Sequence, residues 1–487
     1  MADNGMARSG TAPHVVVVGG GVAGLAAAFF LREEPVRVTV LEGAGRLGGQ
    51  LAVSELAGVV IDEGAESTYA RRPKTARLLK AAGLEERVVA AGTKSMAVWS
   101  GGRLRPPLER QFMGVPCDLD ELAKSGILSE EGVARAREDL TLPRAGREED
   151  RSVADVVGGR LGREVVERLV DPFLSDAYFG RADELSFEAT LTPLVSASRR
   201  RASLAQAAGA LLPEPLPPGQ EPTTGISTLT GGLGSLPQVL ADGLLAASPG
   251  SAVRTGSRVR GLERREDGWR VSVHGAAGDE HLDADAVIVA VPAAQAGPLL
   301  AGLPGTGRAT TALAEIPHAG SVIVTLAFPR RALDAVRGLG HSGYRVPAVD
   351  GRAMKVVTFS TMKWPHLAGE VDIVRCQGGG SGGEDLLARD EADLVALAAA
   401  ELAEVTGVSG TPLASRVSRW ERAVPQYTVG HLERVARIRA GVAAQPGLAV
   451  CGAAYDGVGV GQCVAGALKA AEEVLGELRT TTLAGPA

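Results

Sequence analysis

Two runs of β-branched residues near the N-terminus are separated by a glycine-rich turn and a helical pattern. Val15 to Val18 is a continuous valine run, which is typical of a strand buried on both faces of a parallel sheet. The turn Gly19-x-Gly21-x-x-Gly24 opens an Ala- and Leu-rich helical pattern, and residues 36–41 have the pattern of a second strand. Together they form a βαβ unit of about thirty residues. This unit predicts an α/β fold with a Rossmann-like parallel sheet.

The same turn also predicts a ligand. Because glycines lack side chains, the backbone can approach a pyrophosphate at the positive N-terminus of the helix. Glu42 follows the second strand, where its carboxylate can bond the ribose hydroxyls of a dinucleotide. A glycine-rich turn without a ligand is the alternative, but the order of strand, turn, helix, strand and acid favours a bound dinucleotide. The predicted contacts of the turn are Gly19, Gly20, Gly21, Val22, Ala23 and Gly24.

The length of 487 residues is about three times that of an ordinary domain, so we expect two or three lobes. Strand and helix patterns divide the chain into a disordered leader, a nucleotide-binding domain built from three separated segments, a helical insertion lobe and an α+β domain. These predicted parts are, in that order, residues 1–12; 13–75, 225–300 and 412–480; 76–224; and 301–411.

Charge and cysteine usage narrow the possible partners. A net charge of -6 gives no general electrostatic reason to bind nucleic acid. The four cysteines form no C-x-x-C pair and no metal-like spacing with histidine, which predicts a reduced, cytoplasmic protein without a metal site. The apolar stretch from Val15 to Leu31 contains four glycines and lacks a basic flank, so no signal or membrane-spanning segment is expected there. Peripheral contact with the inner face of a membrane stays open.

Two further segments resemble those of the amine-oxidase-like flavoproteins. Gly45-Arg46-Leu47-Gly48-Gly49-Gln50 resembles their second fingerprint, and residues 62–67 resemble the segment that passes the flavin. The resemblance implies non-covalent FAD, rather than NAD, as the dinucleotide. It implies cofactor contacts at Arg46, Gly49, Gln50, Gly64, Ala65, Glu66 and Ser67.

A second glycine-rich loop, residues 451–463, precedes the last helical pattern. Its amides and the helix dipole can face the edge of the flavin ring where negative charge collects on reduction. Trp420 fits either the core or the wall of a flavin pocket. Cofactor contacts are therefore predicted at Gly452, Val458, Gly459 and Val460, together with Val259 and Trp420.

Other segments narrow the resemblance to the porphyrinogen oxidases, the bacterial FAD enzymes of haem synthesis. These segments are residues 106–116, 171–175, 363–366 and 425–431. The resemblance implies that the α+β domain binds substrate and that the helical lobe contributes to the substrate site or meets a membrane surface. The family pattern Ser-Gly-Val-Tyr is replaced here by Ser175-Asp176-Ala177-Tyr178, a departure that affects the shape of the pocket.

The resemblance implies a six-electron oxidation of a porphyrinogen, with oxygen as the acceptor and a downstream ferrochelatase as a partner. The flavin abstracts hydride, so no protein residue is assigned a catalytic role. Coproporphyrinogen III carries four propionates and protoporphyrinogen IX two. An Arg-rich substrate lobe favours coproporphyrinogen III, with protoporphyrinogen IX as the alternative. Arg71 and Arg72, just after the flavin segment, are the predicted substrate-binding cations.

Two more remote functions are disfavoured. Many amine oxidases carry a flavin-facing Lys where this chain has Val324, which argues against an amine oxidase or a carotenoid desaturase. A flavin-free binding protein resembling the GDP-dissociation inhibitors would share the fold. Glu42, Arg46 and residues 458–460 are intact and argue against that function.

Overall fold

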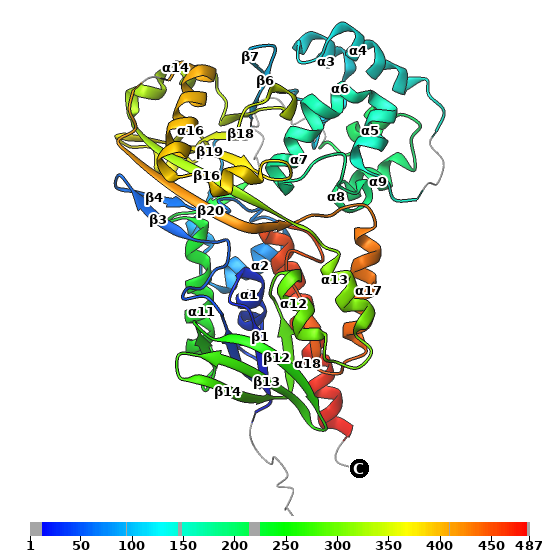
Figure 1. Ribbon diagram of the computed structural model, residues 1–487, viewed down its shortest axis with the longest axis vertical. Helices are drawn as coiled ribbons and strands as arrows, with labels where there is room; N and C mark the ends of the chain where they lie inside the picture. The colour runs from blue at the N-terminus through cyan, green and yellow to red at the C-terminus, as the bar shows by residue number, and fades with distance from the viewer. Residues whose placement is uncertain (1–11, 94, 145–148, 214–224, 409, 485–487) are drawn as a thin grey trace, which may run out of the picture.

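Five parallel strands from distant parts of the chain form one sheet (Figure 1). The computed structural model describes residues 12–93, 95–144, 149–213, 225–408 and 410–484, so residues 1–11 of the predicted leader lie outside it. The strand order is β11-β2-β1-β15-β21, and every neighbouring pair is parallel. The strands are β1 (His14–Val18), β2 (Arg37–Leu41), β11 (Ala252–Arg254), β15 (Ala286–Val289) and β21 (Leu448–Val450).

Both faces of this sheet are buried. Val15 and Val17 point into one core and Val16 and Val18 into another, because successive strand residues face opposite sides. The first core is completed by α1 (Val22–Leu31), α2 (Pro73–Ala81), α11 (Leu236–Ala247) and α18 (Val460–Ala484). The second contains the antiparallel strands β12 (Arg258–Arg265), β13 (Gly268–Gly275) and β14 (Gly278–Ala284), with α12 (Ala293–Leu300), α13 (Gly307–Ala314) and α17 (His431–Ala443). Burial on both sides explains the continuous apolar runs.

A second sheet, mostly antiparallel, lies above the first in Figure 1. Its order is β20-β16-β19-β18-β17-β6-β7. The strands are β6 (Ala97–Ser100), β7 (Arg103–Arg105), β16 (His318–Pro329), β17 (Gly343–Arg345), β18 (Met354–Phe359), β19 (Val371–Gly379) and β20 (Ala414–Pro425). Two helices, α14 (Asp334–Arg337) and α16 (Glu391–Thr406), complete its core. Strand β20 lies in a segment predicted for the nucleotide-binding domain, but it pairs with β16 in the predicted α+β domain. Strands β6 and β7 lie in the predicted helical lobe, but they join the same seven-stranded sheet. The division into domains stays a prediction.

A cluster of short helices forms a lobe beside the second sheet (Figure 1). They are α3 (Leu119–Ser125), α4 (Glu130–Arg137), α5 (Val153–Leu161), α6 (Arg163–Val165), the π-helical turn Val166–Val170, α7 (Asp171–Tyr178), α8 (Phe187–Thr190), α9 (Thr192–Ser198) and α10 (Leu204–Gly209). These helices enclose a core of their own. Short pieces connect the layers: β3 (Val53–Leu56), β4 (Val59–Asp62), β5 (Val88–Ala90), β8 (Gln111–Phe112), β9 (Val115–Pro116), β10 (Ser227–Leu229) and α15 (Ser360–Lys363).

Candidate cofactor and substrate site

Four neighbouring strands of the five-stranded sheet end at one edge. The amide of Gly19 donates to the carbonyl of Leu41 at 2.8 Å, so β1 and β2 end side by side. The Ala290 amide donates to Val18 at 2.8 Å, and the Cys451 amide donates to the β15 residue Val289 at 3.1 Å. Ligands of doubly wound folds bind outside the carboxyl ends of the strands. The structure therefore brings three separated predicted segments to the edge where a dinucleotide would bind.

The first glycine turn has room for a ligand and no room for side chains on its inner side. A Cβ on Gly24 would lie 1.9 Å from the carbonyl oxygen of Gly19, so α1 packs directly against the turn. At Gly21, by contrast, no atom of the described residues lies within 4 Å of an added Cβ. Gly21 is the N-cap of α1, and the first turn of that helix holds no acidic residue. An open backbone cradle at a helix N-terminus fits a pyrophosphate.

Glu42 lies beside this cradle at the end of β2. Its carboxylate accepts hydrogen bonds from the amides of Gly20 and Ala44, both at 2.7 Å. The predicted contact Val259 belongs to the neighbouring β12 and is half-buried against the second core. The amide of Ser257, two residues earlier, donates to the Glu42 carbonyl at 2.8 Å. The acidic side chain is thus held at the place where an adenosine ribose meets this class of turn.

The second fingerprint packs on the first. The amide of Gly48 donates to the carbonyl of Gly20 at 2.8 Å, and Gly48 forms a parallel bridge with Gly21. The Arg46 guanidinium donates back to its own loop, to the carbonyls of Leu47 at 3.0 Å and Gly49 at 2.6 Å. The guanidinium also lies 5.6 Å from the centre of the Trp420 ring. Arg46 therefore fixes the shape of this loop and keeps a cation at the site.

Trp420 and residues 62–67 form the next part of the wall. A Cβ on Gly64 would meet the Gln50 carbonyl at 2.0 Å and the Trp420 ring at 3.0 Å. The Trp420 indole donates to the carbonyl of Glu63 at 2.9 Å, and the Gln50 side chain donates to the carbonyl of Ala423. Trp420 is half-buried and packs on the predicted flavin segment, rather than inside a hydrophobic core.

Glu66 connects the flavin segment to the second sheet. Its carboxylate lies 2.6 Å from Lys363 Nζ and 2.8 Å from Arg375 Nη1, and the same guanidinium donates to the Gly64 carbonyl at 2.7 Å. Burial raises the pKa of the Glu66 carboxyl, but the two cations outweigh it and hold the pKa at about 2. Lys363 belongs to a recognised segment, whereas Arg375 was missed because no motif marks it. Nearby, burial raises the pKa of Asp62 to about 6.

Tyr427 organises the C-terminal glycine loop. Its hydroxyl donates to the carbonyl of Ala453 at 2.5 Å and accepts from the amide of Gly457 at 2.8 Å. Its ring stacks on His431 with centroids 3.7 Å apart. Burial lowers the pKa of His431 to about 4, so this histidine is neutral at pH 7. The sequence assigned His431 no proton-transfer role and gave no sign that Tyr427 bridges the loop.

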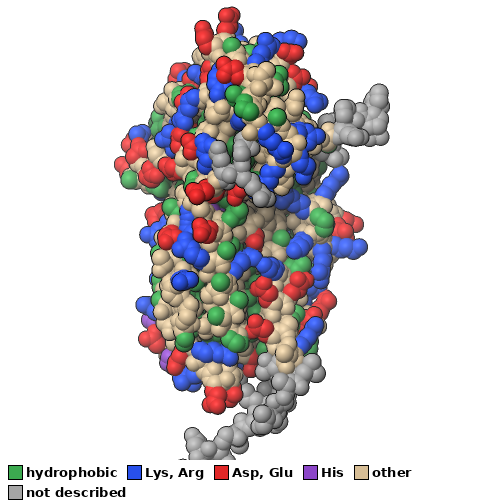
Figure 2. All heavy atoms as spheres, turned by 90° about the vertical axis from the view of Figure 1, so that its right-hand side faces the viewer, with side chains coloured by type: hydrophobic (Ala, Val, Ile, Leu, Met, Phe, Trp, Pro, Cys, Tyr) green, Lys and Arg blue, Asp and Glu red, His purple; other side chains and the backbone are tan. Residues whose placement is uncertain are grey.

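The start of α18 meets the segment that contains the predicted substrate cations. A Cβ on Gly461 would lie 2.9 Å from Thr75 Oγ1 and 3.9 Å from Arg72 Cδ. Arg71 and Arg72 are both exposed, and the Arg72 guanidinium lies 4.8 Å from the centre of the Tyr69 ring. The exposed Arg199 pairs with Glu188 at 3.2 Å. On the face in Figure 2, basic and acidic side chains are interspersed over most of the surface, without a continuous basic face.

Within the described ranges, no group of three or more His, Cys, Asp or Glu side chains is placed to hold a metal ion. Over the same part of the chain, no helix combines the length and apolar character needed to cross a bilayer.

Comparison with known proteins places the chain in a class. The model of the family described as flavin containing amine oxidoreductase matches residues 22–475, and the chain belongs to that family. The cofactor is accordingly FAD. This agrees with the cradle at Gly21, the acid at Glu42 and the two adjoining glycine loops.

Within this family, the chain is similar to porphyrinogen oxidases, as its motifs predict. It is 36% identical over 468 residues to a coproporphyrinogen III oxidase of Mycobacterium tuberculosis, covering 94% of this chain and 96% of that one. It is 30% identical over 466 residues to a Bacillus subtilis protein of the same name, covering 93% and 95%. A crystal structure of a putative protoporphyrinogen oxidase from Exiguobacterium sp. 255-15 superposes with a TM-score of 0.82 at 29% identity, covering 98% and 100%.

Proposed function

We propose that the chain oxidises coproporphyrinogen III to coproporphyrin III in haem biosynthesis, using FAD and oxygen. The observation that carries the proposal is similarity, over more than nine-tenths of both chains, to proteins named coproporphyrinogen III oxidase. When bound, FAD supplies a two-electron acceptor that oxygen restores, so three turnovers remove the six electrons. Oxidation of protoporphyrinogen IX is the alternative, favoured by the name of the Exiguobacterium protein.

In this proposal, the residues of the chain position the cofactor and do not themselves react. The glycine turn and the start of α1 would hold the pyrophosphate, and Glu42 would bond the ribose. Residues 45–50 and 62–67, with Trp420, would hold the flavin. The amides of the loop 452–459 and the positive end of α18 would stabilise negative charge on the reduced cofactor. These assignments are supported by the way the segments pack on one another.

The proposal extends to the arrangement of the parts. The five-stranded sheet and its covering elements form the Rossmann-like FAD-binding domain, assembled from discontinuous segments. The seven-stranded sheet is the core of the α+β substrate domain, and the helical lobe adjoins it. Arg71 and Arg72 bind substrate carboxylates from the FAD side. Two expectations stay predictions: a cytoplasmic location with peripheral contact at the inner face of a membrane, and delivery of the product to a ferrochelatase.

A direct assay tests the proposal. The purified protein should carry flavin that acid precipitation releases, because its motifs resemble those of flavoproteins that hold FAD non-covalently. With coproporphyrinogen III in air it should form fluorescent porphyrin, with a kcat/KM above that for protoporphyrinogen IX. A preference for protoporphyrinogen IX would establish the alternative. Oxidation of amines without oxidation of either porphyrinogen would refute both.

A further inference from the structure

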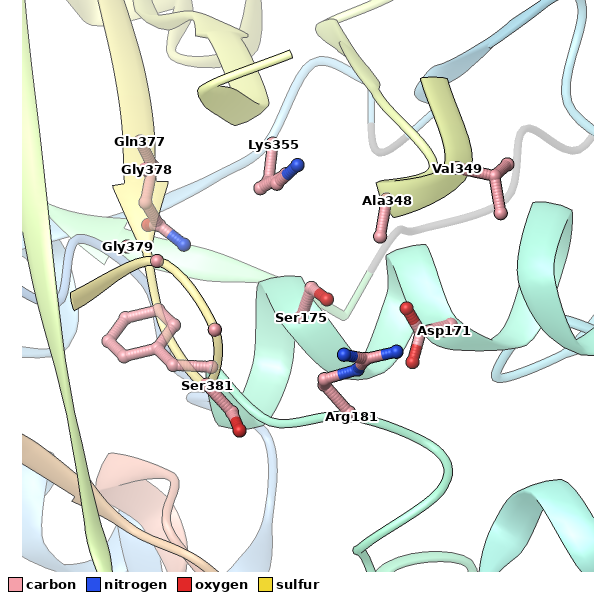
Figure 3. Close-up of a pocket in the computed structure, with 13 residues that line it drawn as sticks. Asp171, Ser175, Arg181, Ala348, Val349, Lys355, Gln377, Gly378, Gly379 and Ser381 are labelled. Atoms are coloured by element: carbon pink, nitrogen blue, oxygen red, sulfur yellow. The ribbon is translucent and has the colours of Figure 1, made fainter. Parts of the chain in front are cut away.

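A pocket lies between the helical lobe and the seven-stranded sheet, and the recognised segment 171–175 contributes Asp171 and Ser175 to its lining (Figure 3). Its volume of about 390 Å³ lies in the range of small-molecule sites. One wall is α7 with the turn that follows it, and another wall is the end of β19 with residues 381–383. Lys355 on β18 and residues 348–349 close the remaining sides.

The wall after β19 is almost bare backbone. Residues 378–383 read Gly-Gly-Gly-Ser-Gly-Gly. A Cβ on Gly380 would lie 2.7 Å from the carbonyl oxygen of Phe179, and the amide of Ser381 donates to that same oxygen at 2.9 Å. The glycine run is therefore tied closely to the turn after α7. With few side chains on this wall, the space stays open and the other walls determine its chemistry.

Those other walls contribute two cations and one carboxyl group. Arg181 and Lys355 line the pocket from different elements, and Figure 3 shows the Arg181 guanidinium near Asp171. Asp171 accepts from the amide of Ala182 at 2.7 Å, and burial raises the pKa of this carboxyl, which favours its neutral form. The Lys355 amino group donates one hydrogen bond, to the Arg352 carbonyl at 2.5 Å, out of the three that it can make. The arrangement favours a ligand that carries a carboxylate.

The pocket is close to the cofactor wall. Gly379 on β19 pairs with Ser321 on β16, and Ser321 pairs with Trp420 on β20. Two strand spacings, about 10 Å, therefore separate the glycine wall from Trp420, which packs on Gly64. A tetrapyrrole with extended side chains is wider than this. A substrate that faces the flavin can reach the pocket with a peripheral carboxylate.

We infer that this pocket is a specificity site that binds substrate propionate through Arg181 and Lys355. The inference rests on the proposed function and deepens it. Coproporphyrinogen III has propionates at the two positions where protoporphyrinogen IX has vinyl groups. A vinyl group cannot accept a hydrogen bond from a guanidinium or an ammonium, so these cations would distinguish the two substrates.

The kinetic test uses the holoenzyme with Arg181→Gln, Lys355→Gln and the double substitution. Each single change should raise KM for coproporphyrinogen III about fivefold to tenfold, between the effect of an exposed ion pair and that of a hydrogen bond to a buried charged group, with little change in kcat. KM for protoporphyrinogen IX should stay within about twofold. Arg181→Lys keeps the positive charge, so it should restore most of the difference in KM between the two substrates. Arg265→Gln, in the β12–β13 hairpin at the opposite end of the molecule, is the matched control and should change neither KM.

A binding measurement tests the inference independently of the proposed function. Fluorescence titration with coproporphyrin III should show about fivefold to tenfold weaker binding in Arg181→Gln than in the parent, and coproporphyrin tetramethyl ester should bind both equally. Unchanged coproporphyrin III binding in both single variants, or equal losses for both substrates, would overturn the inference. If the parent oxidises neither porphyrinogen, the proposed function fails, while the titration still decides whether the pocket binds carboxylate. The Arg181 side chain is 45% exposed, so its variant remains informative if Lys355→Gln does not fold.

Discussion

Glu66 is a buried anion between two cations from another part of the chain. Its side chain is 13% exposed, and those of Lys363 and Arg375 are 14% and 9% exposed. Glu66→Gln would leave two partly desolvated cations without their counter-ion, so we expect the free energy of unfolding to fall by about 3–5 kcal/mol at pH 7. Urea unfolding measures this loss. Glu188→Gln, which breaks the exposed pair with Arg199, should cost less than about 1 kcal/mol.

The same carboxylate makes stability depend on pH in a defined direction. The folded protein holds the pKa of Glu66 at about 2, below its ordinary value of 4.5, so the unfolded chain binds the proton more readily. The stabilisation from Glu66 is complete above about pH 5 and is lost as the pH falls through the window from 4.5 to about 2. The shift corresponds to about 3 kcal/mol. The stability difference between parent and Glu66→Gln should shrink across that window, and a constant difference down to pH 2 would contradict the assignment.

Tyr427 is expected to act on the cofactor through the loop that it bridges. Tyr427→Phe removes the hydroxyl shared by Ala453 and Gly457, so the loop should become less ordered. We expect FAD affinity to fall by about 0.5–1.5 kcal/mol, the usual contribution of one hydrogen bond. Titration of the apoprotein with FAD gives the dissociation constant. Tyr344→Phe, a buried tyrosine in the seven-stranded sheet, should leave this constant unchanged; an equal change in both variants would show a general loss of packing.

For individual residues, the sequence indicated which ones belong to the candidate site but not which side chains they contact. Glu66 was expected to contact the cofactor, but its carboxylate pairs with two cations, which lie 297 and 309 positions later in the chain. Pairing at such separations is determined by how the sheets pack. No local pattern around Glu66 or Arg375 reports it. The cofactor contacts predicted for individual residues remain predictions.

The turn between β1 and α1 contains two glycines with different surroundings, so the same substitution at each position can be compared directly. Gly24→Ala would drive a methyl group into the backbone of Gly19, so we expect a loss of stability of about 1–3 kcal/mol or more. Gly21→Ala meets open space, so folding should change by less than about 0.5 kcal/mol. Its methyl group would instead occupy the cradle and weaken FAD binding by about 1–3 kcal/mol.

Thermal unfolding and FAD titration on the two variants separate these effects. Unchanged FAD affinity in a stable Gly21→Ala protein would show that the pyrophosphate does not lie over this turn. Equal destabilisation by both substitutions would mean that the open space above Gly21 closes in solution.

Buried elements were the most predictable. The valine run became β1 and residues 36–41 contain β2, because fully buried parallel strands leave continuous apolar runs. Strand β20 mixes exposed, half-buried and buried residues without a regular alternation, and such a pattern does not show which sheet the strand joins. The glycine run 378–383 resembles an ordinary loop, so its place in the pocket could not be predicted, whereas the segment 171–175 on another wall was recognised.

Across the whole molecule, discrimination between the two porphyrinogens should depend on ionic strength. Arg71 and Arg72 are exposed, and each contact with a substrate carboxylate should contribute only about 0.2–1 kcal/mol. Substitution of both by alanine should lower kcat/KM for coproporphyrinogen III at low salt. High salt screens exposed charges, so it should also lower the preference of the parent for coproporphyrinogen III over protoporphyrinogen IX. A preference unaffected by salt and by both substitutions would exclude Arg71 and Arg72 as its cause.

The five-stranded sheet takes its strands from both ends and the middle of the chain, and its final strand, β21, begins only at Leu448. The loop 452–459 and α18, which packs against α1, come later still. During synthesis on the ribosome, β1, α1 and β2 emerge first but must wait for the arrival of β21 before their edge is complete. The edge of the sheet therefore cannot be complete before residues 448–460 have been synthesised. A nascent chain stalled after the seven-stranded sheet would expose the glycine turn before the C-terminal glycine loop has been made.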